Sequence, residues 1–346
     1  MPVLLSLLLV SYFMAEAASQ ELDTSLIYPA KVLNGTSEEV CTPSELEMIL
    51  TQIGQEVSNI LQNTDTQCPG QTSEHPASSC HEVSQCDPGL PSDYYSITNA
   101  NGAVVQVYCD MSNRQFVGIT GGWIRAGFLN TSNLTNTCPP GWRTIESTYR
   151  TCGRNAPTAG GYETVTYQTH GISYTHVCGR IKAYQYGSPE AFRPYIDNPY
   201  GAGGRTIDDI YVDGVSLTYG TNPRKHIWTF SAAISRTLIH QYVVCPCTRP
   251  PDTASITVPP FIGSDYFCDA GTDQWIDNSV FYPEDDPLWD GQGCPSTSTC
   301  CQFNSPPWFC RTLPEPTIED IELRLMADQG YNNEDVPLQL IEIFIQ

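Results

Sequence analysis

The chain has 346 residues, with 38 acidic against 16 basic side chains and a formal net charge of −22 at pH 7. This excess of negative charge argues against nucleic acid and anionic membrane surfaces as partners. It suits calcium binding, but solubility is the simpler explanation of the charge. The chain also has 15 cysteines, a number typical of proteins that mature in an oxidising compartment.

The N-terminus has the features of a secretory signal. Residues 3–14 are largely apolar and are followed by Ala15, Glu16 and small residues. This segment is too short to span a membrane, so we expect a signal peptide at residues 1–17 and a secreted, extracellular protein. No later segment is apolar enough for membrane insertion. An N-terminal segment, residues 18–40, follows the signal.

A short coiled-coil helix is predicted at residues 41–66. Thr42, Pro43 and Glu45 form a capping box with proline at the first helical position. Apolar residues then recur at the spacing of a coiled-coil seam; they are Leu46, Leu50, Ile53, Val57 and Ile60. We expect a homo-oligomer through residues 41–68. The alternative is a helix that packs on the head of its own chain.

The odd number of cysteines leaves at least one to pair between chains or to remain free. Cys41 before the helix and Cys68 after it are the interchain disulfide candidates. Residues 67–78 are rich in Pro, Gly, Ser, Thr and Gln, which predicts a linker. Residues 79–346 then form a head in which short β-rich segments alternate with turn signals.

The head begins with a predicted β-hairpin. Residues 94–98 and 104–108 are β-branched and aromatic, and Asn101-Gly102 between them favours a tight turn. A little farther on, Gly122 allows close backbone approach where the large indole of Trp123 is buried. Two antiparallel strands and a buried tryptophan are therefore expected near the start of the head.

These features occur in a distinctive order: Cys80, the hairpin, Cys109 followed by Asp-Met, and Gly-Gly-Trp. The order resembles the opening of fibrinogen-related domains, and the Ser-Cys-x-Glu start resembles their intelectin (X-type lectin) branch. The resemblance extends over residues 79–129. It implies an α+β, β-rich, disulfide-stapled, fibrinogen C-terminal-like (intelectin-like) head with a disulfide between Cys80 and Cys109. It also implies a bridge from Cys86 to the C-terminal cysteines.

Further strands are predicted at residues 162–167, 173–177 and 226–230. Residues 210–217 are interrupted by Asp213-Gly214, which predicts a hairpin turn. The segment Leu338–Ile345 has apolar residues on both of its sides, so we expect a strand buried on both faces. Intelectin-like heads also end in an apolar strand.

The segment 265–310 is where we expect a ligand site. Calcium prefers hard oxygen ligands, and nearby cysteines would fix an irregular loop in place. The candidate calcium ligands are Glu284, Asp285, Asp286 and Asp290, and the aromatic side chains expected to stack on sugars are Trp289, Trp308 and Phe309. The alternative is a solvated, disulfide-rich acidic loop with Trp289 and Trp308 as local core.

Three Asn-x-Ser/Thr sequons are candidate sites of N-glycosylation in a secreted chain. They begin at Asn34, Asn130 and Asn133. Asn130 and Asn133 are expected on one exposed loop, because the residues around them are polar.

The head has no zinc-protease motif, no nucleophile elbow and no phosphate-binding glycine loop, so we do not expect an enzyme. The resemblance implies a secreted extracellular recognition protein, a multivalent calcium-dependent carbohydrate-binding lectin that binds extracellular glycans or glycoproteins. The alternative is an extracellular matrix or cell-surface structural protein that binds other proteins without calcium or sugar. A secreted hydrolase is the third hypothesis.

Overall fold

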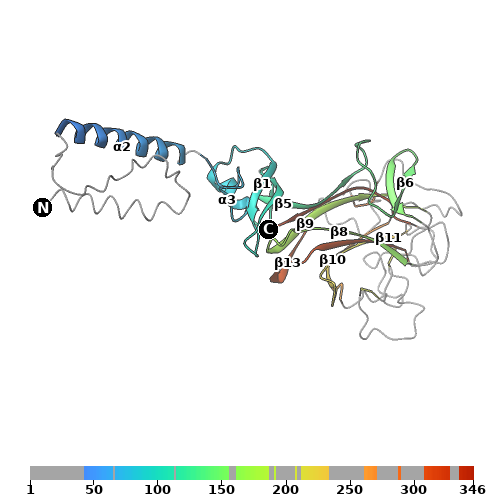
Figure 1. Ribbon diagram of the computed structural model, residues 1–346. Helices are drawn as coiled ribbons and strands as arrows, with labels where there is room; N and C mark the ends of the chain where they lie inside the picture. The colour runs from blue at the N-terminus through green and yellow to red at the C-terminus, as the bar shows by residue number, and fades with distance from the viewer. Residues whose placement is uncertain are drawn as a thin grey trace. The chain divides into compact units, whose positions relative to one another are not determined.

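In a computed structural model of the chain (Figure 1), the residues described are 43–64, 67–112, 114–155, 161–186, 191, 207–208, 212–233, 261–270, 287–289, 308–327 and 335–346. The chain divides into two units, residues 1–66 and residues 67–346. The second unit is called the head below.

The described part of the first unit is one helix, α2 (Pro43–Thr64), which lies within the range predicted for a helix. Several of its apolar side chains are exposed to solvent; they are Met48, Ile49, Leu50 and Ile53. Leu50 and Ile53 belong to the predicted coiled-coil seam. The helix is thus present with seam residues uncovered, and its association with other helices stays a prediction.

The larger sheet of the head has eight strands in its described part. Its main order is β1-β2-β5-β15-β7-β6, and β15 also pairs with β9, which pairs with β13. The strands are β1 (Asp93–Thr98), β2 (Val104–Asp110), β5 (Trp123–Asn130), β6 (Trp142–Glu146), β7 (Arg150–Arg154), β9 (Tyr174–Ala183), β13 (Trp308–Thr317) and β15 (Leu338–Ile345). All pairings between these strands are antiparallel.

A second sheet has five described strands in the order β12-β11-β10-β14-β8. They are β8 (Gly161–Tyr167), β10 (Gly214–Tyr219), β11 (Lys225–Ala233), β12 (Tyr266–Ala270) and β14 (Ile321–Ala327). The β11–β12 pairing is parallel and the others are antiparallel. A small hairpin of β3 (Gln115–Phe116) and β4 (Ile119–Thr120) and the short helix α3 (Cys80–Cys86) complete the described elements.

The two sheets pack face to face on one hydrophobic core. Alternate residues of each strand point inward; Ile181 and Ile341 come from the larger sheet, and Leu217 and Leu323 come from the smaller one. The ring of Phe309 in β13 stacks on that of Trp228 in β11, with centroids 5.8 Å apart. The described head is therefore a β-sandwich, and Figure 1 shows strands of both sheets running through its length.

The expected helical content is not found in the described head. Its one described helix, α3, has seven residues. The β-rich, disulfide-stapled description is confirmed, and the α+β label does not fit the part of the head that can be described. Strand propensity dominates because most core segments alternate apolar and polar residues, which suits a strand with one buried face.

The N-terminal hairpin is confirmed. β1 and β2 pair in register with Thr98 opposite Val104. In the turn, Gly102 has φ +78°, a value that glycine adopts without steric cost. The side-chain carbonyl of Asn99 accepts hydrogen bonds from the backbone N–H groups of Asn101 and Ala103. Local turn chemistry therefore fixes the register of the two strands.

The C-terminal strand is confirmed as well, and its position explains why it is apolar on both sides. β15 lies between β5 and β9 and pairs with each of them along most of its length. Its residues Ile341 and Ile343 face the sandwich core, and Phe344 on the other face packs with Trp123 under the β3–β4 hairpin. A strand covered on both faces has mostly apolar side chains, because both faces are shielded from water.

Four disulfides join described cysteines: Cys68–Cys86, Cys80–Cys109, Cys138–Cys152 and Cys178–Cys310. The Cys80–Cys109 bridge has the pairing that the resemblance implies. Cys68 pairs within its own chain, so its assignment as an interchain candidate is wrong. The same bridge corrects the pairing of Cys86 with the C-terminal cysteines. Cys41 lies outside the described residues.

The predicted linker, residues 67–78, belongs to the head. Ala77 forms a parallel bridge with Ile97 of β1, and the backbone N–H of Ser96 donates to the carbonyl of Gly70. The Cys68–Cys86 bridge then ties this segment to α3. Polar and small residues predicted flexibility here, but backbone hydrogen bonds and a disulfide hold the segment against the edge of β1.

The predicted hairpin turn at Asp213-Gly214 is also wrong, because Gly214 is the first residue of β10. A Cβ atom at Gly214 would lie 1.9 Å from the carbonyl oxygen of Phe230. Glycine is required here because two strands approach closely, which is a use of glycine that sequence alone does not distinguish from a turn.

Candidate ligand-binding site

The four predicted calcium ligands, Glu284, Asp285, Asp286 and Asp290, lie outside the described residues. Within the described ranges, no group of three or more His, Cys, Asp or Glu side chains is placed to hold a metal ion. The calcium site at these four residues therefore stays a prediction.

Two of the three predicted sugar-stacking residues belong to the core. Trp289 is 2% exposed, and its ring lies 5.5 Å from that of Phe230. Its backbone N–H donates to the Asp269 carboxylate and its indole N–H donates to the carbonyl of Ser231. Phe309 is 5% exposed. Their assignment as ligand-binding residues is wrong, because rings distant in sequence pack around them.

Trp308 is half-buried, but its ring is already occupied. The guanidinium of Arg114 lies 4.6 Å from the ring centroid and that of Arg180 lies 4.8 Å from it. The ring of Phe116 approaches to 4.9 Å. Cation–π and aromatic packing therefore use the surfaces that a sugar would stack on, and Trp308 also has a structural role.

Two of the three sequons are described. Asn130 is the last residue of β5 and is half-buried, whereas Asn133 is exposed in the following turn. The carbonyl of Asn130 accepts a hydrogen bond from the side chain of Asn136, which closes the loop that follows β5. Asn133 thus lies on an exposed loop as predicted, Asn130 ends a strand instead, and glycosylation of either residue stays a prediction. Asn34 lies outside the described residues.

An open cleft lies where β2 and β5 separate. These strands pair only at Cys109–Ile124 and Asp110–Trp123, and beyond those pairs they diverge. The resulting cleft has a volume of about 260 Å³ and is lined by Tyr94, by parts of β2 and β5, and by the segment 168–170 that follows β8. The cleft thus forms between β2 and β5, where their backbones no longer pair.

Aromatic rings and one cation line this cleft. Tyr94 and Tyr108 are opposite each other in the hairpin, with ring centroids 5.6 Å apart in an edge-to-face arrangement. The guanidinium of Arg125 lies 3.7 Å from the centroid of Tyr108 and 4.5 Å from that of Phe128. Tyr94 is 64% exposed and Phe128 is 40% exposed. This is an unusual amount of aromatic surface to leave in water, and it is typical of binding sites.

The far wall of the cleft is held by hydrogen bonds to the hairpin turn. The side-chain amide of Asn99 donates to the carbonyl of His170, and the backbone N–H of Ala100 donates to the carbonyl of Gly171. The Thr169 N–H donates to the Asp320 carboxylate. His170, which is exposed, has φ +56°. The wall is therefore fixed from both sides and presents polar side chains to the cleft.

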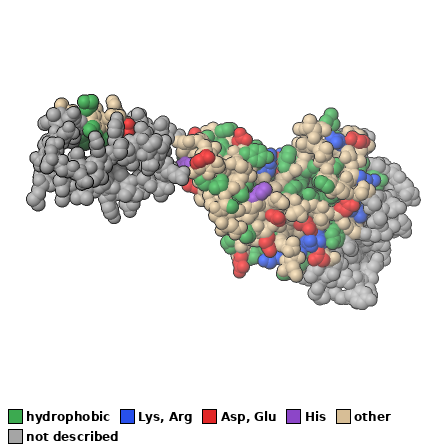
Figure 2. All heavy atoms as spheres, viewed as in Figure 1, with side chains coloured by type: hydrophobic (Ala, Val, Ile, Leu, Met, Phe, Trp, Pro, Cys, Tyr) green, Lys and Arg blue, Asp and Glu red, His purple; other side chains and the backbone are tan. Residues whose placement is uncertain are grey.

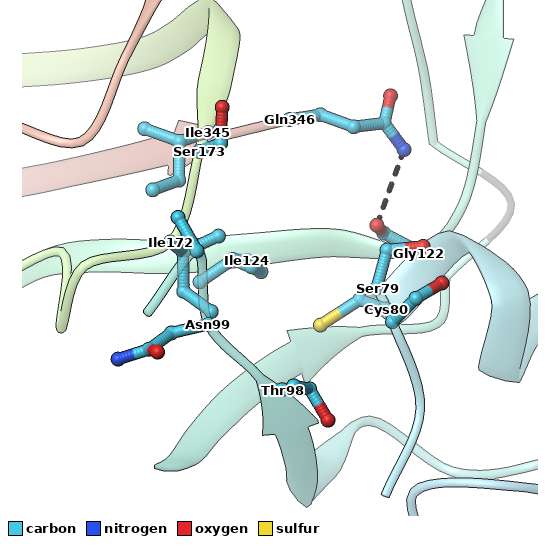
Figure 3. Close-up of a pocket in the computed structure, with 12 residues that line it drawn as sticks. Ser79, Cys80, Thr98, Asn99, Gly122, Ile124, Ile172, Ser173, Ile345 and Gln346 are labelled. Atoms are coloured by element: carbon cyan, nitrogen blue, oxygen red, sulfur yellow. Dashed lines mark hydrogen bonds between the residues drawn. The ribbon is translucent and has the colours of Figure 1, made fainter. Parts of the chain in front are cut away.

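A second pocket, of about 250 Å³ and shown in Figure 3, shares the lining residue Ile124 with the cleft. Its apolar lining includes Ile124, Ile172 and Ile345, and the side-chain amide of Gln346 donates to the carbonyl of Gly122 at 3.2 Å. Asn99 is part of its lining but already satisfies the hairpin turn. We favour the cleft as the ligand site because Tyr94 and Phe128 leave much of their surface exposed to solvent and Arg125 has no ion pair with a described residue.

A buried chain of polar groups on the smaller sheet also merits comparison with a catalytic site. His226 Nε2 lies 2.8 Å from the hydroxyl of Thr229, which lies 2.9 Å from that of Ser216. Thr229 and Ser216 are fully buried. Burial, together with neighbouring Arg311, lowers the pKa of His226 to about 3. Hydroxyl groups enclosed in this way cannot meet a substrate, so the chain of hydrogen bonds is structural.

This histidine is expected to make stability depend on pH. Below pH 6.5 the unfolded chain takes up a proton on His226 that the folded head cannot bind until about pH 3. Neutral His226 therefore costs the folded head no stability above pH 6.5. As the pH drops from 6.5 to 5, this residue lowers the free energy of unfolding by about 2 kcal/mol. Urea unfolding at a series of pH values measures it. His226→Asn should flatten the dependence, whereas exposed His170→Gln should not; an unchanged slope in His226→Asn would refute the assignment.

Neither a protein-family model nor a curated protein sequence matches this chain. In the residues that the structure describes, no helix is long and apolar enough to cross a membrane. The case for a function therefore depends on the geometry of the cleft and on the chemistry of the chain.

The sequence patterns do not identify the residues of the cleft. They predict Tyr94 and Tyr108 only as strand residues, and they do not indicate Arg125 or Phe128. One signal was available: the predicted hairpin places Tyr94 and Tyr108 on the same face, opposite each other. A pair of tyrosines on the solvent side of a sheet edge is a reason to look for a ligand.

Proposed function

We propose that this chain is a secreted extracellular recognition protein whose head binds carbohydrate in the cleft between β2 and β5. The observation that carries the proposal is the array of Tyr94, Tyr108, Arg125 and Phe128 around an open cleft. The disulfides of the head support secretion, because such bridges persist in oxidising compartments.

The chemistry of the cleft suits a sugar. A pyranose ring has apolar C–H faces that pack on aromatic rings and hydroxyl groups that need hydrogen-bond partners at its edge. The exposed rings of Tyr94 and Phe128 supply the aromatic surface for the sugar ring. The hydrogen-bond partners for its hydroxyl groups are supplied by Gln106, Gln168 and His170. Pockets that combine apolar surface with a few fixed polar groups are the usual form of small-ligand sites.

Calcium dependence is part of the proposal. Its support is the acidic composition of the chain and the carboxylate-rich segment that contains Glu284, Asp285, Asp286 and Asp290. A lectin of this kind would lose ligand, thermal stability or both when calcium is chelated. The alternative, a matrix or cell-surface structural protein, predicts that a chelator has no effect and that no glycan binds.

Truncation of one aromatic ring in the cleft is expected to weaken glycan binding. Tyr108→Ala removes the ring that contacts both Tyr94 and Arg125, and we expect a loss of about tenfold or more in affinity, since aromatic anchors dominate such sites. A glycan array followed by titration calorimetry, with calcium and with a chelator, measures the loss.

The matched control is Tyr162→Ala. Tyr162 is 40% exposed, and Arg324 lies 3.9 Å from its ring centroid on the other sheet. The same kind of Tyr–Arg stack is therefore removed away from the cleft, and binding should be unchanged. If no glycan binds the wild-type protein with or without calcium, the carbohydrate proposal fails and the structural alternative replaces it.

The stalk helix is proposed to make the protein multivalent. Exposed Leu50 and Ile53 lie on the predicted coiled-coil seam of α2, and association through them would convert weak sugar contacts into avidity. Ile53→Asp should reduce the mass in solution to that of a monomer by sedimentation equilibrium. Gln55→Asp adds the same charge away from the seam and should leave the mass unchanged. A wild-type monomer contradicts the proposal.

A further inference from the structure

One arginine in the head differs from the others in its ionic environment. The side chain of Arg125 forms no ion pair and no hydrogen bond with the residues that the structure describes, whereas every other described arginine forms an ion pair with a carboxylate. Those pairs are Arg114–Asp110, Arg143–Asp335, Arg150–Glu146, Arg154–Asp335, Arg180–Glu342, Arg224–Asp208, Arg224–Glu322, Arg311–Asp265, Arg324–Asp208 and Arg324–Glu322.

The contrast matters because acidic side chains are abundant. The chain has 38 acidic and 16 basic residues, so a surface arginine would readily meet a carboxylate of its own protein. Figure 2 shows acidic, basic and apolar side chains interspersed over the face in view. An arginine with no described carboxylate partner has its charge available to a ligand.

The position of Arg125 is also fixed. Its guanidinium stacks on Tyr108 at 3.7 Å and contacts Phe128 at 4.5 Å. Stacking on aromatic faces uses the flat side of the guanidinium and leaves its N–H edges free to donate. The group is half-buried and lines the cleft. It is therefore an oriented set of donors with no acceptor among the described side chains.

We infer that the ligand of the cleft is an acidic sugar, whose carboxylate or sulfate is bound by the free N–H edge of Arg125. This inference rests on the proposed carbohydrate function and names the class of glycan. Planar, bidentate donation to carboxylate or sulfate is what a guanidinium does best. Tyr94 and Phe128 then supply packing for the sugar ring, as in the proposed function.

The overall charge restricts the ligand further. A net charge of −22 repels densely charged polyanions at long range. Arg125 is one oriented cation in a protein of negative potential. It therefore favours a sugar with one acidic group, because such a sugar can bind the guanidinium while its single charge is only weakly repelled by the rest of the protein.

The test compares neutral and acidic forms of one sugar on the full-length protein. The probes are glucose, glucuronate and glucose 6-sulfate, with galactose and galacturonate as a second set, measured by saturation-transfer NMR and calorimetry at constant ionic strength. The wild-type protein is expected to bind the acidic forms about tenfold or more tightly, since hydrogen bonds to charged groups are the strong ones. The carboxylate and sulfate arms show which acid is preferred.

Arg125→Gln is expected to abolish the preference for acidic sugars, and Arg125→Lys to retain part of it. The control is Arg114→Gln, which removes an arginine that also stacks on aromatic rings but is paired with Asp110; its preference should match the wild type. Circular dichroism establishes that each variant is folded.

The possible failures differ from one another. Equal binding of neutral and acidic sugars overturns this inference and leaves the carbohydrate function standing. A preference for acidic sugars that survives in Arg125→Gln overturns the role of Arg125. Binding of sodium sulfate as tightly as glucose 6-sulfate shows a bare anion site and overturns the inference. Absence of binding by any sugar overturns the proposed function and this inference together.

Discussion

Replacement of Asp335 by alanine is expected to lower the free energy of unfolding of the head by about 3–5 kcal/mol. Asp335 is fully buried. Its carboxylate lies 3.4 Å from Nε of Arg154 and accepts hydrogen bonds from the backbone N–H groups of Arg154 and Val336. Arg154 is itself only 2% exposed. The alanine variant therefore removes the buried carboxylate that pairs with this buried guanidinium and accepts two backbone hydrogen bonds, and breaking a buried pair from one side is costly.

Urea unfolding followed by tryptophan fluorescence measures this loss. The matched control is Glu146→Ala, which removes a carboxylate that is 69% exposed and lies 3.2 Å from Arg150. A surface pair of this kind contributes about 1 kcal/mol or less. A double variant, Asp335→Leu with Arg154→Met, should recover much of the loss because both nearly fully buried charges are removed, and the second partner of Asp335, Arg143, is 28% exposed. Equal losses in Asp335→Ala and Glu146→Ala would contradict the argument.

Gly122→Ala is expected to destabilise the head by more than about 3 kcal/mol. A Cβ atom at this position would lie 2.4 Å from Cα of His81 and 2.7 Å from the carbonyl oxygen of Cys80, and Gly122 has φ +65°. The atoms in the way belong to the backbone of α3, which cannot move without disturbing the disulfide from Cys80 to Cys109. The cost of backbone strain and the cost of overpacking therefore both contribute to the loss of stability in Gly122→Ala.

The two contributions can be separated with Gly102→Ala. Gly102 has φ +78°, but a Cβ atom there would have nothing within 4 Å. This variant carries only the cost of a left-handed backbone, about 1–2 kcal/mol. Thermal and urea unfolding of both variants measure the difference. If the two glycines prove equally sensitive, close packing against α3 is not the reason for glycine at position 122.

Local patterns predicted those parts of the fold that local chemistry determines. The turn at Asn101-Gly102 sets the register of the first hairpin, and the run of apolar residues at Leu338–Ile345 indicates a strand covered on both faces. The burial of Trp123 beside Gly122 was predicted for a similar reason. In each case, neighbouring residues carry enough information to specify the structure.

Contacts between distant segments were not predictable in this way. The sequence leaves open whether Trp289 contacts a ligand or belongs to a local core, and the structure encloses its ring with Phe230 and Ser231 from β11. Arg125 meets Tyr108 only because β2 and β5 pair at Cys109–Ile124. Pairing between strands that are not joined by a tight turn depends on the whole core, so periodicity along one segment does not reveal it.

The place of β15 in the larger sheet has a consequence for biosynthesis. β15 (Leu338–Ile345) follows every other described strand in the chain, yet it lies between β5 and β9. β5 and β9 cannot complete their pairing until β15 has been synthesised. Until then, their edges expose unpaired backbone N–H and C=O groups that can pair with other chains. We therefore expect nascent chains of this protein to depend on chaperones, and chains that end before β15 to be retained and degraded rather than exported.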